Sequence, residues 1–224
     1  MGASRLKGKD QVRRFGEGLI DVSNKDAPSL TNPSGWRSRG YLPHFDGGPI
    51  PQSITFRLID SLPTVRMREW TAELAELPLR QAENEGRRRI EEYLDLGTGE
   101  QWLSRPPIAE LVEQALLWFD AQRYCLHAWV LMPNHVHVLI TPRLGNDLSE
   151  ILQSWKSFTA KKANELLGRT GAFWQQEYFD RFVRHEQHFE DALKYIEFNP
   201  VKAGLCNHPE SWRFSSAAWR SSAK

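Results

Sequence analysis

The stretch Ala128-Trp-Val-Leu-Met-Pro-Asn-His-Val-His-Val-Leu-Ile-Thr-Pro142 decides the fold of this chain. Apolar and β-branched residues lie on both sides of Met132-Pro133-Asn134, a short linker that contains residues favoured in turns. The pattern therefore predicts two strands, over about residues 124–131 and 135–141, that pair as an antiparallel hairpin.

Two histidines give the second strand its chemical interest. Side chains on a strand point to alternate faces, so His135 and His137 project from the same face while Val136 points the other way, into a core. Two imidazoles placed in this way can share one divalent metal ion. The alternative, two hydrogen-bonded histidines on a half-exposed strand, stays open at this point.

The flanking sequence predicts a mixed α+β domain. Alternation over residues 53–59 predicts another strand, and a short strand or loop is expected within residues 179–184. Helices are expected over about residues 64–93 with an interruption near Pro78, over 107–119, from 148 to a stop at Gly168, and over 187–198. The helix that begins at residue 148 has an apolar stripe at Leu148, Ile151, Leu152, Trp155, Phe158 and Leu166. The charged run 83–95, which contains Arg87, Arg88 and Arg89, is interpreted as a solvated helix face.

Composition excludes several classes of protein. The chain has 224 residues, of which 40% are hydrophobic and 25% charged, as is usual for a soluble globular protein. No apolar run approaches the ~18 residues of a membrane span, and two cysteines are too few for a disulfide scaffold. We therefore expect a cytoplasmic protein without a membrane partner. The net charge of +1 argues neither for nor against a nucleic-acid partner.

The first 40 residues have the composition of an extension. They contain eight Lys and Arg against four acids, together with much Gly, Ser, Asn and Pro. Such a segment buries too little apolar surface to offset the entropy of ordering it. We predict a basic, flexible extension over residues 1–40, with or without phosphate contacts, followed by a single domain over residues 41–224.

The last predicted helix carries a second candidate group. Its buried stripe is formed by Phe189, Ala192, Leu193 and Ile196. Tyr195 lies on the flank of this stripe, and Asn199 stacks one turn later on the same face. Pro200 disfavours continuation, so we expect the helix to end near Asn199, where the macrodipole favours a cation.

Several segments resemble one known family in the same order. The strand Trp129-Val-Leu-Met-Pro-Asn-His-Val-His137 resembles the HUH motif of single-tyrosine transposases. The segment Tyr195-Ile-Glu-Phe-Asn-Pro-Val-Lys-Ala-Gly204 resembles the catalytic-helix signature of REP-associated tyrosine transposases, relatives of IS200/IS605-type transposases that act on repetitive extragenic palindromes. Further similar segments are Ile54-Thr-Phe-Arg57, Ser154-Trp-Lys-Ser-Phe158, Phe173-Trp-Gln-Gln-Glu-Tyr-Phe-Asp-Arg181 and Trp212-Arg-Phe-Ser-Ser216. The resemblance covers about residues 41–220.

The resemblance implies a fold and a site. The fold is a ferredoxin-like antiparallel sheet with helices packed on it, the HUH endonuclease fold. His135 and His137 match the metal-binding histidines, Tyr195 matches the nucleophile, and Asn199 matches the third protein ligand of the metal. The implied reaction is cleavage and rejoining of single-stranded DNA through a 5′-phosphotyrosine, on palindromic hairpins of the REP type. It also implies a bacterial, nucleoid-associated protein, either a monomer or a homodimer.

The ligand types suit a divalent ion. Two imidazoles and one amide are neutral, so the ion would keep its full charge opposite a phosphate, and they fit Mn²⁺ better than Mg²⁺, although abundance favours Mg²⁺. Candidate DNA contacts are Arg181, Arg184, Lys202 and Lys156. Tyr178 is a rival nucleophile without a ligand partner four residues on. Two other functions remain open: a hairpin-binding module with little catalysis, and a metal-dependent phosphoesterase in which Tyr195 is structural.

Overall fold

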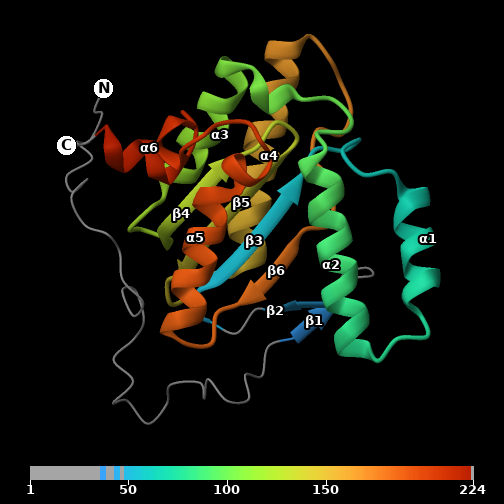
Figure 1. Cartoon of the computed structure of the whole chain (residues 1–224). Coiled ribbons are helices and arrows are strands. Elements are labelled where there is room, and N and C mark those ends of the chain that lie inside the picture. Colours follow the sequence, from blue (N-terminus) through green and yellow to red (C-terminus); the bar gives the residue numbers. More distant parts are fainter. Residues whose placement is uncertain (1–35, 39–42, 46–47, 223–224) are drawn as a thin grey trace, which may run out of the picture.

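A four-stranded antiparallel sheet forms the centre of the computed structural model, which describes residues 36–38, 43–45 and 48–222 (Figure 1). The strands are β3 (Gln52–Arg57), β4 (Tyr124–Leu131), β5 (His135–Pro142) and β6 (Phe179–Phe182). Their order in the sheet is β4-β5-β3-β6, and each neighbouring pair is antiparallel. The predicted hairpin is therefore confirmed, and β5 with its two histidines is a central strand.

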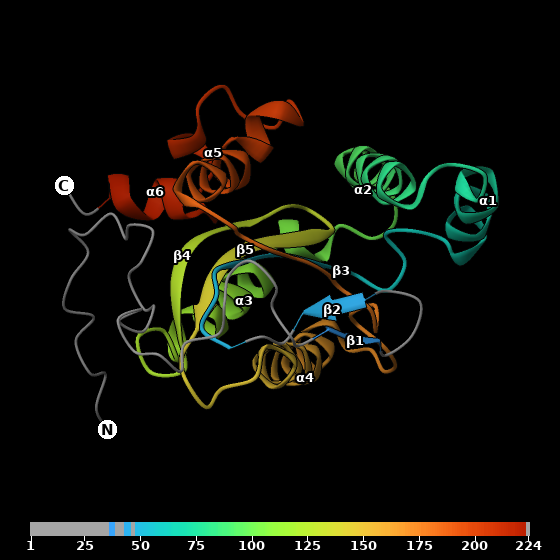
Figure 2. The ribbon, with the colours of Figure 1, turned by 90° about the horizontal axis from the view of Figure 1, so that it is seen from below.

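Helices cover both faces of this sheet (Figure 2). One face carries α3 (Pro106–Trp118) and α4 (Leu148–Leu167). The other carries α5 (Glu186–Lys202), and beside it α2 (Leu79–Asp95) and α1 (Thr64–Leu74). The chain also contains the short helix α6 (Ser216–Ser221) and two 3₁₀ turns, Trp102–Ser104 and Pro209–Ser211. This α+β architecture agrees with the predicted helix-covered antiparallel sheet.

Strand alternation divides the interior into two apolar layers. On β5, Val136, Val138 and Ile140 point into the larger core, which the sheet shares with α3 and α4. Leu139 of the same strand belongs to the layer under α5, where it packs with Phe189 and Ile196. The odd-numbered residues of β5 therefore face α5, which places both histidines on the side of Tyr195.

A second, two-stranded sheet lies near the N-terminal side of the domain. It pairs β1 (Trp36–Ser38) with β2 (Pro43–Phe45) in antiparallel fashion. The boundary predicted at residue 40 falls between these two strands, and residues 1–35 of the predicted extension lie outside the described part of the chain. No helix within residues 48–222 is long and apolar enough to cross a membrane.

Two details of the helices differ from the sequence prediction. The last helix does not end near Asn199 but continues through Pro200 to Lys202. Proline removes a single backbone donor there, and the helix still closes because the amides of Ala203 and Leu205 donate to the carbonyls of Asn199 and Pro200 at 2.9 and 2.8 Å.

The second difference concerns the apolar stripe of α4. Phe158 and Leu166, which were expected on the buried side, are 52% and 60% exposed. Thr159 and Ala163 occupy the buried face instead, with 1% and 0% of their surface exposed. The buried stripe thus runs from Leu152 and Trp155 to Thr159 and Ala163. Because Thr159 is polar, the apolar pattern of the sequence does not include it.

Candidate active site

The two histidines form a buried pair on the face of the sheet under α5. His135 is 1% and His137 2% exposed. Their Nε2 atoms lie 3.0 Å apart, and the two rings are nearly perpendicular, at 89°. The strand geometry predicted from the sequence therefore brings one nitrogen of each ring to the same point.

A polar neighbour contacts the Nδ1 atom of each ring. The Nδ1 atom of His135 lies 2.7 Å from Oδ1 of Asn134, whose Nδ2 donates to the carbonyl of Thr98 at 2.9 Å. The Nδ1 atom of His137 lies 2.7 Å from the hydroxyl of Thr55, its direct partner across the β3–β5 pairing. These contacts leave the Nε2 atoms as the ends of the two rings that face each other.

Burial keeps both imidazoles neutral. It lowers the pKa of His137 to about 3, and the charge of Lys202 adds to this effect. Burial also lowers the pKa of His135 well below its usual value, and His137, Arg57 and Lys202 act in the same direction. Neutral imidazole is the form that binds a metal ion, so the environment of the pair suits ligation.

Helix α5 brings Tyr195 against this pair. The rings of Tyr195 and His137 are in edge-to-face contact, with centroids 5.6 Å apart. The Tyr195 hydroxyl is buried and has no hydrogen bond of normal geometry with the described residues. Burial raises its pKa above the usual range, and the carboxyls of Glu91 and Asp95 on α2 contribute to the increase. The phenol is therefore fully protonated at neutral pH before any ligand arrives.

Asn199 lies one turn after Tyr195 in the same buried layer. Its side chain is 0% exposed, and neither its Oδ1 nor its Nδ2 makes a hydrogen bond of normal geometry with the described residues, although the amide lies close enough to the Tyr195 hydroxyl to lower the pKa of that group slightly. A buried amide without partners is costly, and such groups are few in native proteins. The amide oxygen is thus available as a ligand, which fits the role that the resemblance implies.

The donor set fits a divalent ion. Two facing imidazole nitrogens and one unpartnered amide supply three neutral ligands, with each His ring oriented through its other nitrogen as in known metal sites. The described residues contain no group of three or more His, Cys, Asp or Glu side chains that could hold a metal ion, so an ion bound here would take two histidines and an amide as its protein ligands.

The candidate DNA-contact residues do not all lie near this site. Lys202 lies over the Tyr195 ring, with Nζ 5.7 Å from its centroid, and pairs with Asp95 at 3.0 Å. Arg181 lines the same cavity as Tyr195. Arg184 lies beyond it and packs its guanidinium over Phe182, 5.1 Å from the ring centroid.

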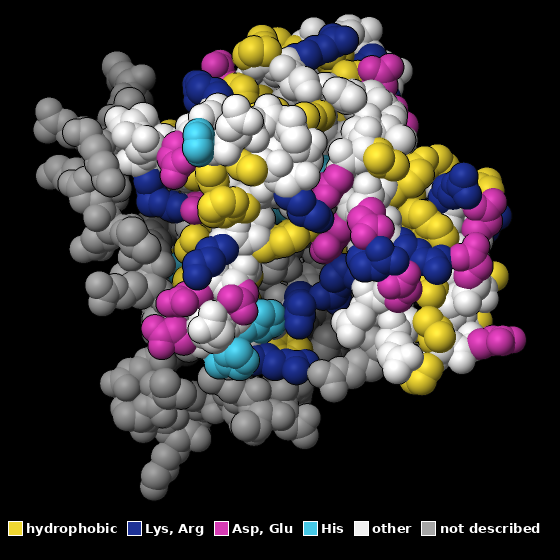
Figure 3. All heavy atoms as spheres, viewed as in Figure 1, with side chains coloured by type: hydrophobic (Ala, Val, Ile, Leu, Met, Phe, Trp, Pro, Cys, Tyr) yellow, Lys and Arg dark blue, Asp and Glu magenta, His cyan; other side chains and the backbone are white. Residues whose placement is uncertain are grey.

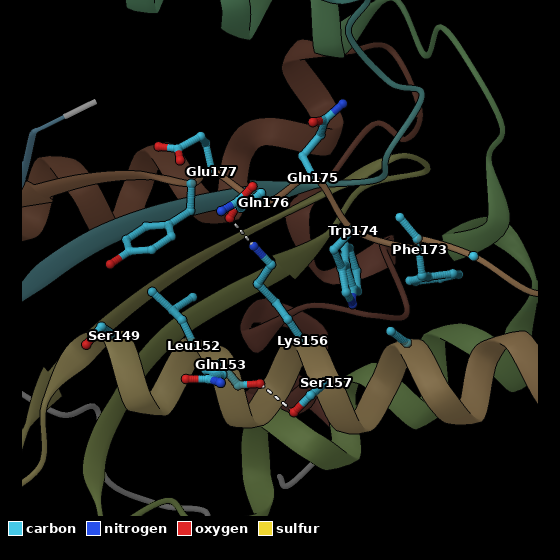
Figure 4. Close-up of a pocket in the computed structure, with 14 residues that line it drawn as sticks. Ser149, Leu152, Gln153, Lys156, Ser157, Phe173, Trp174, Gln175, Gln176 and Glu177 are labelled. Carbon is cyan, nitrogen blue, oxygen red and sulfur yellow. Dashed lines mark hydrogen bonds between the residues drawn. The ribbon is translucent and has the colours of Figure 1, made fainter. Parts of the chain in front are cut away.

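Lys156 lies on the other face of the sheet. It belongs to α4 and lines a cavity of about 490 Å³ between this helix and the segment 171–178 (Figure 4). Its Nζ donates to the carbonyl of Gln176 at 2.6 Å, and burial lowers its pKa to about 8. Tyr178 lines this cavity too, so the structure does not bring either residue to the histidine pair.

Four residues around the site were not among the predicted ones. Thr55 and Asn134 hold the histidines, and Glu91 and Asp95 reach Tyr195 from α2. Alternation places Thr55 on the face of β3 opposite to Ile54 and Phe56, and Asn134 directly precedes His135, so both were weakly indicated by the sequence. The two acids carried none, because they lie in a run that has the pattern of a solvated helix.

Comparison with known proteins agrees with this geometry. Residues 105–199 match the family described as "Transposase IS200 like". A REP-associated tyrosine transposase of Escherichia coli (strain K12) is 28% identical over 91 residues, which cover 41% of this chain and 53% of that protein. A putative REP-associated tyrosine transposase of Haemophilus influenzae is 25% identical over 96 residues, covering 38% and 54%. The chain thus spans about half the length of these curated relatives.

A solved structure shares the fold. It is that of a REP-associated tyrosine transposase bound to a REP hairpin, with a TM-score of 0.55, 18% identity, and coverage of 83% of this chain and 86% of that one. The family match includes the strand with His135 and His137 and the helix with Tyr195 and Asn199. Over residues 105–199 the chain is similar to the IS200-like transposases, and its similar relatives and its fold neighbour are REP-associated tyrosine transposases.

Proposed function

We propose that this protein cleaves and rejoins single-stranded DNA, with Tyr195 as the nucleophile. The observation that carries the proposal is the contact between the Tyr195 ring and His137, beside a pair of imidazoles whose Nε2 atoms lie 3.0 Å apart. The histidine pair and Asn199 offer ligands for a divalent ion, and the Tyr195 ring in contact with His137 would stand beside that ion. The relatives named above support DNA as the substrate.

The proposed reaction conserves the energy of the phosphodiester. The Tyr195 oxygen attacks the phosphorus and forms an O–P bond, the bond from phosphorus to the 3′ oxygen breaks, and the phenol proton leaves as the 3′-hydroxyl forms. The product is a 5′-phosphotyrosine, which a 3′-hydroxyl can attack in the reverse direction. The strand is then rejoined without ATP.

The residues at the site would divide the work. His135, His137 and Asn199 would hold a divalent ion, Mn²⁺ or Mg²⁺, which supplies charge neutralisation at the phosphate. Burial raises the pKa of Tyr195 in the metal-free protein, so the phenol keeps its proton until the substrate and the ion are bound.

We propose a palindromic hairpin with unpaired flanks as the substrate. The structural neighbour is bound to a REP hairpin, and the chain matches it over 83% of its length. That likeness shows the fold, and the specific hairpin of this protein has to be found experimentally. Palindromic repeats that flank the gene in its own genome are the natural first probes.

The decisive experiment traps the covalent intermediate. Purified protein is incubated with Mn²⁺ or Mg²⁺ and a hairpin oligonucleotide labelled at its 3′ end, and the products are separated on a denaturing protein gel. The labelled part carries the 5′-phosphate after cleavage, so we expect a labelled protein band that Tyr195→Phe abolishes. Tyr178→Phe is the matched control, since Tyr178 lines the cavity on the opposite face, and it should leave the band unchanged.

Other outcomes identify other functions. Cleavage that persists in Tyr195→Phe without a protein-linked band would indicate a phosphoesterase that uses water. A band that disappears only in Tyr178→Phe would move the nucleophile to that residue. Tight hairpin binding without cleavage in any variant would indicate a binding module.

A further inference from the structure

A groove leads along the surface to Tyr195. It is a cavity of about 350 Å³ with α2 on one side, α5 on the other and residues of β3 and β6 beneath. Tyr195 and Thr55 line its inner part, next to the histidine pair. In the space-filling view, Lys and Arg side chains gather along the hollow between α5 and α2 (Figure 3). Any phosphodiester that reaches the Tyr195 hydroxyl has to enter a space that this tyrosine lines.

One of three consecutive arginines on α2 differs from the other two. Arg88 pairs with Glu85 and Glu92, each at 2.6 Å, and Arg89 pairs with Glu73 and Glu85. Arg87 lines the groove and makes no ion pair or hydrogen bond with the described residues. Helix α2 therefore uses two of its arginines for ion pairs and presents the third, half-buried, to the groove.

The opposite wall and the floor add further polar groups. His188 of α5 lines the wall opposite Arg87, and Arg181 of β6 lines the floor together with Ser53 and Thr55 of β3. Part of the ring of Phe179 is also exposed to it. Arginines from α2 and β6 beside two hydroxyl side chains are features that bind a sugar–phosphate backbone.

Three acids line the groove, namely Glu91, Asp180 and Asp191, and two of them are paired or have a raised pKa. Asp191 accepts a hydrogen bond from Gln187 at 2.9 Å. Glu91 is directed at the Tyr195 hydroxyl, and burial raises the pKa of this carboxyl, which reduces its mean negative charge. The carboxylates in the groove therefore repel an anionic strand less strongly than fully charged, unpaired carboxylates would.

We propose that this groove holds the unpaired DNA strand next to the bond that Tyr195 attacks, with Arg87 of the α2 wall and Arg181 of the floor contacting its phosphates. This inference rests on the proposed function. It gives α2 a role in substrate binding, although this helix lies outside residues 105–199, which match the family. The Lys202–Asp95 ion pair, 3.0 Å long, joins α5 to α2 beside the Tyr195 ring.

The test measures binding rather than cleavage. Fluorescein-labelled oligothymidine of twelve nucleotides is titrated with protein in EDTA at several salt concentrations, and the anisotropy gives the association constant. Each phosphate contact on a single strand contributes about 0.7 to the slope of log K against log salt. We expect Arg87→Gln and Arg181→Gln each to lower this slope by about that amount and to weaken binding at low salt.

Matched variants control for charge and folding. Arg68→Gln removes the same charge from an exposed position on α1 that does not line the groove, and should leave the slope unchanged. Arg87→Lys keeps the charge and should restore most of the slope. Thermal unfolding of every variant, monitored by circular dichroism, verifies that the fold is intact.

Two results overturn the proposal. One is that Arg87→Gln and Arg181→Gln bind as Arg68→Gln does, or that the wild-type protein does not bind oligothymidine at low salt. The other is that photocrosslinks from 4-thiothymidine map to α3 and α4 rather than to residues 84–95 and 179–195. Because no cleavage is involved, strand binding in the groove stands even if Tyr195→Phe retains cleavage, and the proposed function stands if only the groove fails.

Discussion

The Nε2 atoms of His135 and His137 lie 3.0 Å apart, and this distance fixes the protonation of both rings. Asn134 directs its amide oxygen at Nδ1 of His135, so that nitrogen must carry the proton and Nε2 of His135 carries a lone pair. In the absence of a cation, His137 must then donate from Nε2, and Thr55 must donate its hydroxyl proton to Nδ1 of His137. When a cation takes both lone pairs, the His137 proton moves to Nδ1 and the same hydroxyl accepts it.

The first prediction concerns the Thr55 hydroxyl. It donates to Nδ1 of His137 when no cation is bound and accepts from Nδ1 when a cation is bound. Thr55→Val removes this partner and leaves a buried Nδ1–H of His137 without an acceptor once a metal is bound. We expect the affinity for Mn²⁺ to fall about 10- to 100-fold, measured by isothermal titration calorimetry. Ser53→Ala, on the same face of β3, should bind Mn²⁺ as the wild type does. An unchanged affinity in Thr55→Val would show that His137 is not a ligand through Nε2.

The second prediction separates the functional from the structural role of Asn199. Its amide is fully buried without partners, and this should cost about 1–3 kcal/mol in the metal-free protein. Asn199→Leu, similar in size, should therefore raise the free energy of unfolding in EDTA and abolish the stabilisation by Mn²⁺. Asn199→Asp should lower the free energy of unfolding in EDTA, because it buries a charge. It should keep the stabilisation by Mn²⁺, because it retains an oxygen ligand. Urea unfolding with and without Mn²⁺ measures both, and equal Mn²⁺ stabilisation in all three proteins would remove Asn199 from the ligand set.

Local periodicity was sufficient to predict the strand with the histidines and the helix with the tyrosine. Alternation placed His135 and His137 on one face, and the helical repeat placed Tyr195 and Asn199 one turn apart. Both patterns depend only on neighbours a few residues away. The end of α5 was predicted too early, because a proline in the last turn removes only one hydrogen bond and the chain closes the turn beyond it.

Contacts between distant segments could not be predicted in this way. Thr55 faces His137 because of the register between β3 and β5, which are 82 residues apart at this point. The position of α2 beside α5 could not be predicted either, because the charged sequence of α2 does not indicate which element lies next to it. This position brings Glu91 and Asp95 close to Tyr195. Thr159 interrupts the apolar pattern of α4 for a similar reason: its hydroxyl is satisfied by Trp155 and Trp174, which only the fold reveals.

The third prediction tests a hydrogen-bond chain in the core under α4. The Tyr124 hydroxyl donates to the carbonyl of Leu116 at 2.7 Å and accepts from the indole of Trp155 at 3.0 Å. Tyr124→Phe leaves a buried indole N–H and a carbonyl without this partner, so we expect a loss of about 1–3 kcal/mol in the free energy of unfolding. Tyr93→Phe is the control, since the Tyr93 ring packs on Trp70 and its hydroxyl makes no hydrogen bond with the described residues. Equal stabilities of the two variants in urea titrations would contradict the chain.

The fourth prediction uses the buried Glu113 on α3, which is 6% exposed and accepts a hydrogen bond from the Trp129 indole at 3.2 Å. Burial raises its pKa above the ordinary value of 4.5, against the opposing effects of Trp129 and Arg213. A carboxyl whose pKa is higher in the folded state stabilises the protein only below the unfolded pKa, and this contribution is lost as the pH rises through the folded pKa.

Glu113→Gln keeps the acceptor oxygen for Trp129 but cannot ionise. The variant should therefore gain stability relative to the wild type as the pH rises from 4 to 7, with the difference levelling off above the raised pKa, while other titrating groups cancel between the two proteins. Urea unfolding at unit pH intervals measures this difference. Glu110→Gln, which removes an exposed carboxylate 3.6 Å from the same Arg213, should show no such rise. A difference between Glu113→Gln and the wild type that stays constant from pH 4 to 7 would mean that Glu113 ionises in the folded protein as easily as in the unfolded chain.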